Sequence, residues 1–193
     1  MRVSKVEAEK NRERIIEVAA KLFREHGFDG IGVADLMKSA GLTHGGFYGH
    51  FTSKEDLMAQ ACTRAQTDSL ATFQNIATQH GENGLIAIAS AYLSLTHRDQ
   101  TSEGCVVAAL GSEAARHSTP VQQAFTQGVH CALGMLTALI PKHLEDSKHE
   151  QALTIYASMV GAMIIARAID DPKLSEEILQ SVMMSIIHTT TPQ

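Results

Sequence analysis

Apolar residues recur at helical spacing along the chain, and the points where this pattern stops divide it into helices. A first helix is predicted from about residue 10 to residue 25, and a short second helix over about residues 33–40. Thr43 is a good cap for a short third element, and Ser53 opens a fourth helix that extends to about residue 79. A helix, a glycine-containing turn and a short capped element in this order have the spacing of a helix-turn-helix.

The rest of the chain keeps the same helical spacing. The elements predicted there are a helix near residues 85–95, a polar loop at 96–104, a helix from Cys105, a helix between Pro120 and Pro141, a helix at 148–169 and a ninth helix after a turn at 170–177. The prediction is therefore an all-α fold of nine helices. Residues 1–52 would form an N-terminal three-helix domain and residues 53–193 a larger body, linked by the helix that begins at residue 53.

The composition favours a packed, cytoplasmic protein. Hydrophobic residues make up 44% of the chain, which is too much for a disordered protein. The three cysteines lack the spacing of a disulfide framework or a zinc ribbon, and the first 25 residues lack the apolar core of a signal peptide. Polar residues interrupt the apolar stretch at 152–169, which is shorter than the ~20 residues of a membrane span. We expect neither a membrane partner nor a cofactor.

Charge is distributed unevenly along the chain. Residues 1–64 carry ten Lys and Arg against nine Asp and Glu, whereas residues 65–193 carry six against twelve. The basic excess is sharpest in residues 1–24, with seven Lys and Arg against four Glu. A basic N-terminal segment on an acidic body points weakly to a polyanionic partner, and a solvated helix face is the alternative interpretation.

The stretch GLTHGGFYGHF at residues 41–51 combines four glycines with aromatic and histidine side chains. In a helix, Phe47 and Phe51 share one face and can enter a core, while His44 and Tyr48 lie off that face. A phosphate-binding loop is excluded, because neither GxxxxGK[ST] nor a GxGxxG after a strand is present. The stretch is therefore interpreted as the second helix of the helix-turn-helix.

Residues 10–58 resemble the TetR/AcrR family of bacterial transcription regulators. The resemblance rests on IIEVAAKLFREHGFDG, VADLMKSAGL and above all THGGFYGHFTSKEDL, in which an aromatic-x-His-Phe precedes Ser-Lys-Glu-Asp-Leu. Beyond about residue 75 only helix number and length are similar. The resemblance implies a homodimer whose DNA-binding heads are attached to helical bodies that bind a small effector. It also implies a repressor that leaves its palindromic operator when the effector binds.

The resemblance implies DNA contacts for particular residues. The family pattern places Thr43, Tyr48, His50 and Lys54 on phosphates, and it places His44, Gly46 and Gly49 at base edges. The backbone at Gly45 and the side chain of Lys38 complete the predicted surface. Because two of the three base-edge positions have no side chain, we expect thin direct readout, with DNA shape supplying much of the specificity.

The body is expected to hold an effector pocket, largely apolar and lying between its helices. Residues at inward helical positions supply its predicted lining, which comprises Phe73, Tyr92, Cys105, Phe125 and Met135. Cys105 opens a helix, where a thiolate is favoured, so it is a candidate sensor of electrophiles that His97, Arg98 and Arg116 could assist. Plain core packing is the alternative for all five residues.

The last two helices are the predicted dimer interface. A helix that is apolar on nearly all sides has to be buried on all sides, so a partner subunit should cover one face. The predicted interface consists of Leu153, Ala157, Val160, Gly161, Ile164 and Ala168 in one helix and Leu179, Val182, Met183 and Ile186 in the next.

Two other classes of function compete with a DNA-binding regulator. An enzyme is disfavoured, since the sequence has no nucleophile–base pair, no metal-ligand set and no cofactor fingerprint. His143 and His149 lack trustworthy metal-ligand spacing. A helical sensor that acts through protein partners without binding DNA remains the second alternative.

Overall fold

The computed structural model describes residues 4–191, and these residues form helices and connecting turns. The helices are α1 (Lys5–His26), α2 (Val33–Ser39), α3 (Lys54–His80), α4 (Gly84–Tyr92), α5 (Leu95–Asp99), α6 (Val106–Ala114), α7 (Thr119–Leu139), α8 (Lys148–Ala168) and α9 (Pro172–Thr190). Short 3-10 helices lie between them, namely η1 (His44–Gly49), η2 (Gly81–Asn83), η3 (Thr101–Glu103) and η4 (Lys142–Ser147). The predicted all-α fold with nine helices is thus confirmed for the described part of the chain.

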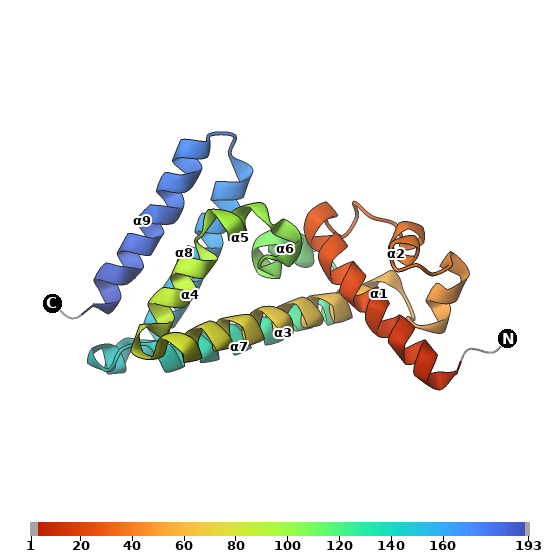
Figure 1. Ribbon diagram of the computed structural model, residues 1–193, viewed down its shortest axis with the longest axis horizontal. Helices are drawn as coiled ribbons and strands as arrows, with labels where there is room; N and C mark the ends of the chain where they lie inside the picture. The colour runs from red at the N-terminus through yellow and green to blue at the C-terminus, as the bar shows by residue number, and fades with distance from the viewer. Residues whose placement is uncertain (1–3, 192–193) are drawn as a thin grey trace.

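The N-terminal head consists of α1, α2, η1 and the first turns of α3 (Figure 1). Its core is built around fully buried side chains of each element, including Ile15, Phe23, Leu36 and Phe47. This core continues without a gap into α6 and α7 through residues such as Leu110. The domain boundary predicted after residue 52 therefore marks a proposed DNA-binding unit, and no break in packing coincides with it.

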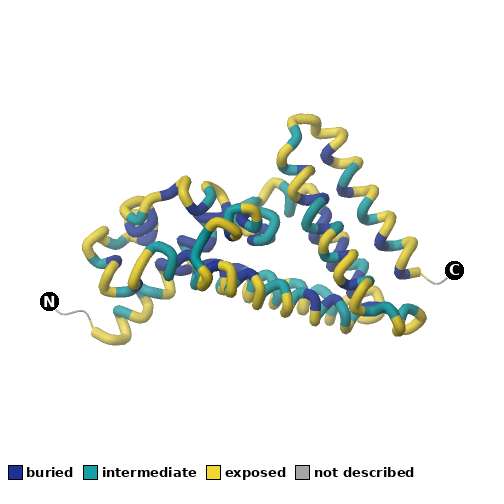
Figure 2. Tube along the Cα trace, turned by 180° about the vertical axis from the view of Figure 1, so that it is seen from behind, coloured by how far each residue is buried: buried dark blue, intermediate teal, exposed yellow. Residues whose placement is uncertain are grey.

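The body is arranged around two long helices that lie side by side, α3 and α7 (Figure 1). Helices α8 and α9 form a hairpin beyond them, and α4 packs between this hairpin and α3. A second core, which includes Ile88, Tyr92, Leu136 and Met163, fills the space between these helices. Buried and exposed positions alternate along α8 and α9 with helical spacing, as the colouring in Figure 2 shows.

Three local predictions were wrong. Helix α1 begins at Lys5 rather than near residue 10, because the Ser4 hydroxyl caps it by accepting from the Glu7 backbone N at 3.1 Å. The predicted loop at 96–104 contains α5 and η3, since the Ser94 hydroxyl caps α5 by accepting from the His97 backbone N at 3.1 Å. The third predicted helix is η1, a 3-10 helix, and α5 takes its place in the count of nine.

Candidate functional site: a DNA-binding surface and an effector pocket

Side chains of η1, together with Phe51 just after it, separate into a buried and an exposed set. Phe47 is fully buried and Phe51 nearly so, and their rings lie 5.5 Å apart in the head core. Tyr48, in contrast, is 72% exposed although its ring lies edge-on against Phe47 at 5.2 Å. The aromatic pair thus anchors η1 while the Tyr48 hydroxyl remains available to a phosphate or a base.

Most of the residues predicted to contact DNA lie on the surface of the head. The exposed ones are Lys38, Thr43, His44, Gly45, Tyr48 and Gly49. Gly46 and His50 are half-buried. Thr43 occupies the cap position of η1, yet its hydroxyl makes no capping hydrogen bond among the described residues, so it is free to donate elsewhere.

Lys54, the remaining predicted contact, has a second role in the structure. Its Nζ donates to the backbone carbonyl of Phe28 at 2.6 Å and so ties the start of α3 to the turn after α1. An ammonium group has three N–H donors, which leaves two for a phosphate.

The fold itself does not require the glycines at two positions of η1. A Cβ placed on Gly45 or Gly49 would meet no described atom within 4 Å, and the φ angles of both residues lie outside the left-handed region. Glycine in a helical segment lowers its stability. A requirement for glycine at these positions would therefore have to come from a molecule that approaches the backbone from outside.

The first connection between head and body lies at the end of α1. Gly27 has φ of 77° and turns the chain, after which the Phe28 backbone N donates to the Glu113 carboxylate at 2.8 Å. A Cβ on Gly27 would lie 2.8 Å from the same carboxylate. The close approach of Glu113 thus depends on glycine at this position, and it fixes the end of α6 to the head.

A second connection joins the start of α3 to the turn between α6 and α7. The Glu55 carboxylate accepts from the Ser118 hydroxyl at 2.7 Å and pairs with His117 Nδ1 at 2.9 Å. Burial by itself would raise the pKa of Glu55, but the hydrogen bonds from His117 and Ser118 outweigh it, so the pKa is lowered. The His117 ring also packs edge-on against Phe28 at 4.8 Å.

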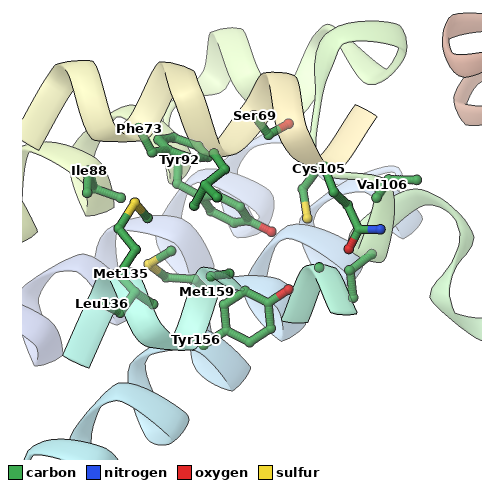
Figure 3. A pocket seen from close by; sticks show the side chains of 15 residues that line it. Ser69, Phe73, Ile88, Tyr92, Cys105, Val106, Met135, Leu136, Tyr156 and Met159 are labelled. Carbon is green, nitrogen blue, oxygen red and sulfur yellow. The ribbon is translucent and has the colours of Figure 1, made fainter. Parts of the chain in front are cut away.

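A pocket opens inside the body between α3, α4, α6, α7 and α8 (Figure 3). Four of the five predicted effector residues line it, namely Phe73, Tyr92, Cys105 and Met135. Phe125 does not line the pocket. It is instead buried in the core shared by the head, α6 and α7, because its position on α7 faces that core.

Other lining residues were not predicted from the sequence, although the helical spacing on α3 contained a signal for them. Gln66, Ser69 and Leu70 precede Phe73 at helical spacing on α3 and line the pocket with it. Tyr156 and Met159 of α8 complete another wall. Extending the helical face of Phe73 by two turns would have identified the α3 residues.

The polar groups of the pocket are uncharged. Its lining contains no Asp, Glu, Lys, Arg or His among the described residues. Burial raises the pKa of Tyr92 well above its usual value, with the nearby Cys105 thiol contributing next. Burial likewise raises the pKa of Tyr156. Both phenols are therefore neutral at physiological pH.

Cys105 is the N-cap residue of α6, and its backbone N donates to His97 Nε2 at 3.0 Å. Because Nε2 accepts this bond, it carries no proton, and Nδ1 donates to the Tyr92 carbonyl at 2.6 Å. Burial lowers the pKa of His97, which agrees with a neutral ring. His97 thus positions the Cys105 backbone and supplies no positive charge to the thiol.

The other two residues expected to assist Cys105 lie elsewhere. Arg98 pairs with Asp99 at 2.7 Å, and Arg116 is exposed beyond the opposite end of α6. The residue missed here is Arg24 of α1, which is buried and donates from Nη1 to the Gly104 carbonyl at 2.9 Å. Burial lowers the pKa of Arg24, while the carboxylates of Glu103 and Asp68 act in the opposite direction. A further connection thus joins the head to the residue before Cys105.

The cysteines of α3 and α7 differ from Cys105. Cys62 is buried, and this burial raises the pKa of its thiol to about 12, so it is unreactive. Cys131 is exposed on α7.

The predicted dimer residues fall into two groups. Leu153, Ala157, Ile164 and Ala168 of α8 are exposed, and the half-buried ones are Val160, Gly161, Val182 and Met183. Leu179 and Ile186 are buried at 2% and 3% exposure, because the face of α9 that carries them packs on α8 and α4 of the same subunit. Their assignment to the interface was wrong, and Leu174 and Met184 are the large exposed apolar residues of α9.

The described residues can also be compared with the patterns of a metal site and of a membrane-crossing helix. No group of three or more His, Cys, Asp or Glu side chains within residues 4–191 is placed to hold a metal ion. One segment, Lys142–Ala168, has the length and mean hydropathy of a membrane-crossing helix, which by itself is weak evidence. The same segment contains α8, with one side in the body core and the other side carrying Leu153 and Ile164.

Comparison with known proteins places this geometry in a family. The sequence model for bacterial regulatory proteins of the tetR family matches residues 15–61. The HTH-type transcriptional repressor NemR of Escherichia coli K12 is 24% identical over 166 residues, which cover 81% of this chain and 83% of that protein. The HTH-type transcriptional regulator AcrR of Shigella flexneri is 37% identical over 59 residues, which cover 31% of this chain and 27% of that protein.

Solved structures share the fold along nearly the whole chain. The reduced form of E. coli NemR superimposes with a TM-score of 0.81 at 21% identity, covering 95% of this chain and 100% of that one. A TetR-family regulator from Cytophaga hutchinsonii gives a TM-score of 0.82 at 20% identity, with both chains fully covered. The matched head, the aligned regulators and the common fold together identify the chain as a member of the TetR/AcrR family of bacterial transcriptional regulators, with a DNA-binding N-terminal domain.

Proposed function

We propose that this protein is a cytoplasmic, homodimeric repressor that binds a palindromic operator and releases it when a small effector enters the pocket of the body. The observation that carries the proposal is the exposed face of η1, where Thr43, His44 and Tyr48 present donors while Phe47 anchors the element in the core. Hydroxyl and imidazole groups on a short helical element suit phosphates and base edges in a major groove. NemR, whose name describes a repressor, aligns along most of the chain.

A second copy of the chain is the proposed cover for the exposed face of α8. Leu153 and Ile164 are 43% and 45% exposed, and Ile165 is 50% exposed. A Cβ on Gly161 would meet no described atom within 4 Å, so a partner helix can approach closely there. Two-fold symmetry of the subunits then matches two operator half-sites one or more helical turns apart.

Reaction of an electrophile with the Cys105 thiol is the proposed alternative trigger for release. The thiol lines the pocket and lies beside the Gly104 carbonyl that Arg24 of the head holds. Addition of a bulky group at this position would fill the pocket and press on α6.

Electrophoretic mobility shifts test both parts of the proposal. The purified protein is mixed with DNA selected from a random pool, with and without N-ethylmaleimide, and compared with Cys105→Ser. We expect a sequence-specific shift that weakens steeply as salt rises, because counterions are released from the phosphates. Loss of the shift in wild type alone would support thiol sensing, whereas equal loss in Cys105→Ser would reject it. Failure to enrich any DNA sequence would contradict the proposed repressor.

A further inference from the structure

The effector pocket contains two buried polar atoms that have no hydrogen-bond partner within residues 4–191. They are the hydroxyl oxygen of Tyr92 and Oε1 of Gln66. Tyr92 is only 2% exposed, and the group that acts on its hydroxyl is the Cys105 thiol, which is a weak hydrogen-bonding group and leaves the hydroxyl oxygen without a full partner. An unpaired buried polar atom costs about 1–3 kcal/mol, so a ligand that pairs with either atom recovers part of that cost.

Charge in the pocket limits the ligand further. The lining is formed by apolar side chains, two phenols, a thiol, a hydroxyl and a carboxamide. A carboxylate or ammonium group that entered would lose its hydration without meeting an opposite charge among the lining side chains. The half-buried Arg167 guanidinium acts on Tyr92 and Cys105 but does not line the pocket. Gln66 Oε1 can only accept a hydrogen bond, whereas the Tyr92 hydroxyl can donate or accept.

From this geometry we infer that the effector is an uncharged, mainly apolar molecule bearing a hydroxyl group, which donates to Gln66 Oε1 or exchanges a hydrogen bond with Tyr92. A phenol is the simplest member of this class, since its ring suits the Phe73, Met135 and Met159 walls (Figure 3). This inference rests on the proposed function, because it specifies the ligand of the same pocket.

The size of the cavity adds a consequence for regulation. Its volume is about 60 Å³, whereas a cavity that holds benzene measures roughly 150 Å³. A phenol therefore has to displace wall atoms, and the unbranched side chains of Met135 and Met159 can adopt other rotamers. The ligand enlarges a space that is bounded by α3, α7 and α8.

A change in the volume of the pocket can reach α3, the helix that begins in the head, through Gln66. Its Nε2 donates to the Cys62 carbonyl at 3.2 Å and, across the helix interface, to the Ala124 carbonyl of α7 at 3.1 Å. The carboxamide packs so closely on Gly128 that a Cβ there would overlap it. A ligand bound to Oε1 thus acts on the residue that joins α3 to α7.

Calorimetric titration of the full-length protein without DNA tests the inference with three matched probes at pH 7. The probes are 4-ethylphenol, ethylbenzene and 4-ethylbenzoate, which share a ring and an ethyl group and differ in the polar substituent. We expect 4-ethylphenol to bind about tenfold more tightly than ethylbenzene, and 4-ethylbenzoate to bind more weakly than both. Equal affinity for 4-ethylphenol and ethylbenzene, tighter binding of 4-ethylbenzoate, or no binding of any probe would overturn the inference.

Two variants locate the hydrogen bond. In Tyr92→Phe, the preference for 4-ethylphenol should fall at least about threefold where the ligand hydroxyl pairs with Tyr92, and should persist where it pairs with Gln66 Oε1. Thermal stability should not fall, because the removed hydroxyl has no partner. Tyr156→Phe is the matched control, since it removes a phenol hydroxyl from the same pocket that is not among the buried unpartnered atoms. An unchanged preference in Tyr92→Phe would remove Tyr92 from the site. Binding of 4-ethylphenol without release of DNA would contradict the proposed function and leave this ligand chemistry standing.

Discussion

Replacing Gly45 and Gly49 with alanine should make the protein more stable and a weaker DNA binder. Both residues are exposed on η1, and a Cβ on either would meet no described atom within 4 Å. The substitutions therefore introduce no clash in the free protein, and they restrict the unfolded chain. If the backbone of η1 lies against DNA in the complex, the same methyl groups occupy the space of a base or a phosphate.

The two effects differ in sign and can be estimated separately. A Gly→Ala change at a compatible position stabilises by about 0.4–1 kcal/mol, so the double variant should gain about 1–2 kcal/mol. For a protein of this size, each kcal/mol raises Tm by roughly 2–4 °C. Loss of one good base contact costs about 1–3 kcal/mol, and a dimer loses it at both half-sites. DNA affinity should therefore fall by at least about tenfold.

Differential scanning calorimetry and a DNA titration at fixed salt measure the two effects on the same samples. Gly134→Ala is the control, because Gly134 is exposed on α7, outside η1, and a Cβ there would meet no described atom within 4 Å. It should raise Tm without changing DNA affinity. If the double variant is stabilised but binds DNA as tightly as wild type, the backbone of η1 does not approach DNA closely and the reasoning fails. If the double variant is less stable than wild type, the added methyl groups are not free of contacts in the folded protein.

Two further predictions concern the connections of α6. Glu113→Ala leaves the Phe28 backbone N without its acceptor, so the free energy of unfolding, measured in urea, should fall by about 1–2 kcal/mol. An unchanged midpoint of unfolding would show that this hydrogen bond does not stabilise the fold. Burial lowers the pKa of His97 below that of a histidine in the unfolded chain, about 6.5. As the pH falls from 7.5 to 5.5, the unfolded state therefore binds more protons than the folded state, and the stability of the fold decreases. His97→Gln should flatten this dependence, and an equal slope in both proteins would contradict the neutral ring that holds the Cys105 backbone.

The parts of the fold that follow from local sequence could be predicted. Helical spacing of apolar residues located the long helices, because each of them buries one face in a core. The Ser53 cap and the aromatic pair of η1 were also recognisable, since capping and an i, i+4 pair depend on neighbours in the chain. The Ser4 cap depends on equally local chemistry and was overlooked.

The parts that depend on distant contacts could not be predicted. The Ser94 cap of α5 is local, but the polar segment at 96–104 also depends on Arg167 of α8, which donates to the Arg98 and His97 carbonyls at 3.0 and 2.7 Å. An apolar stripe on α9 likewise does not reveal whether its cover is another helix of the same subunit or a second subunit. For this reason Leu179 was predicted to lie at the subunit interface, whereas it is buried in the core of its own subunit.

Helix α6 is the element through which an event in the pocket would reach the head. Its nine residues span roughly 13 Å at 1.5 Å per residue, with Cys105 in the pocket at one end and Glu113 at the other. The head is held at both ends, by Arg24 on the Gly104 carbonyl and by the Phe28 backbone N on Glu113. A ligand that moves the first turn of α6 must therefore either break the Arg24–Gly104 bond, which leaves Nη1 of the guanidinium unpaired while Nε still donates to the Ala20 carbonyl, or carry α1 with it. Breaking the bond is costly, because a hydrogen bond lost from a buried charged group is penalised more heavily than one lost from a neutral group. Movement of the head with α6 is thus the favoured response.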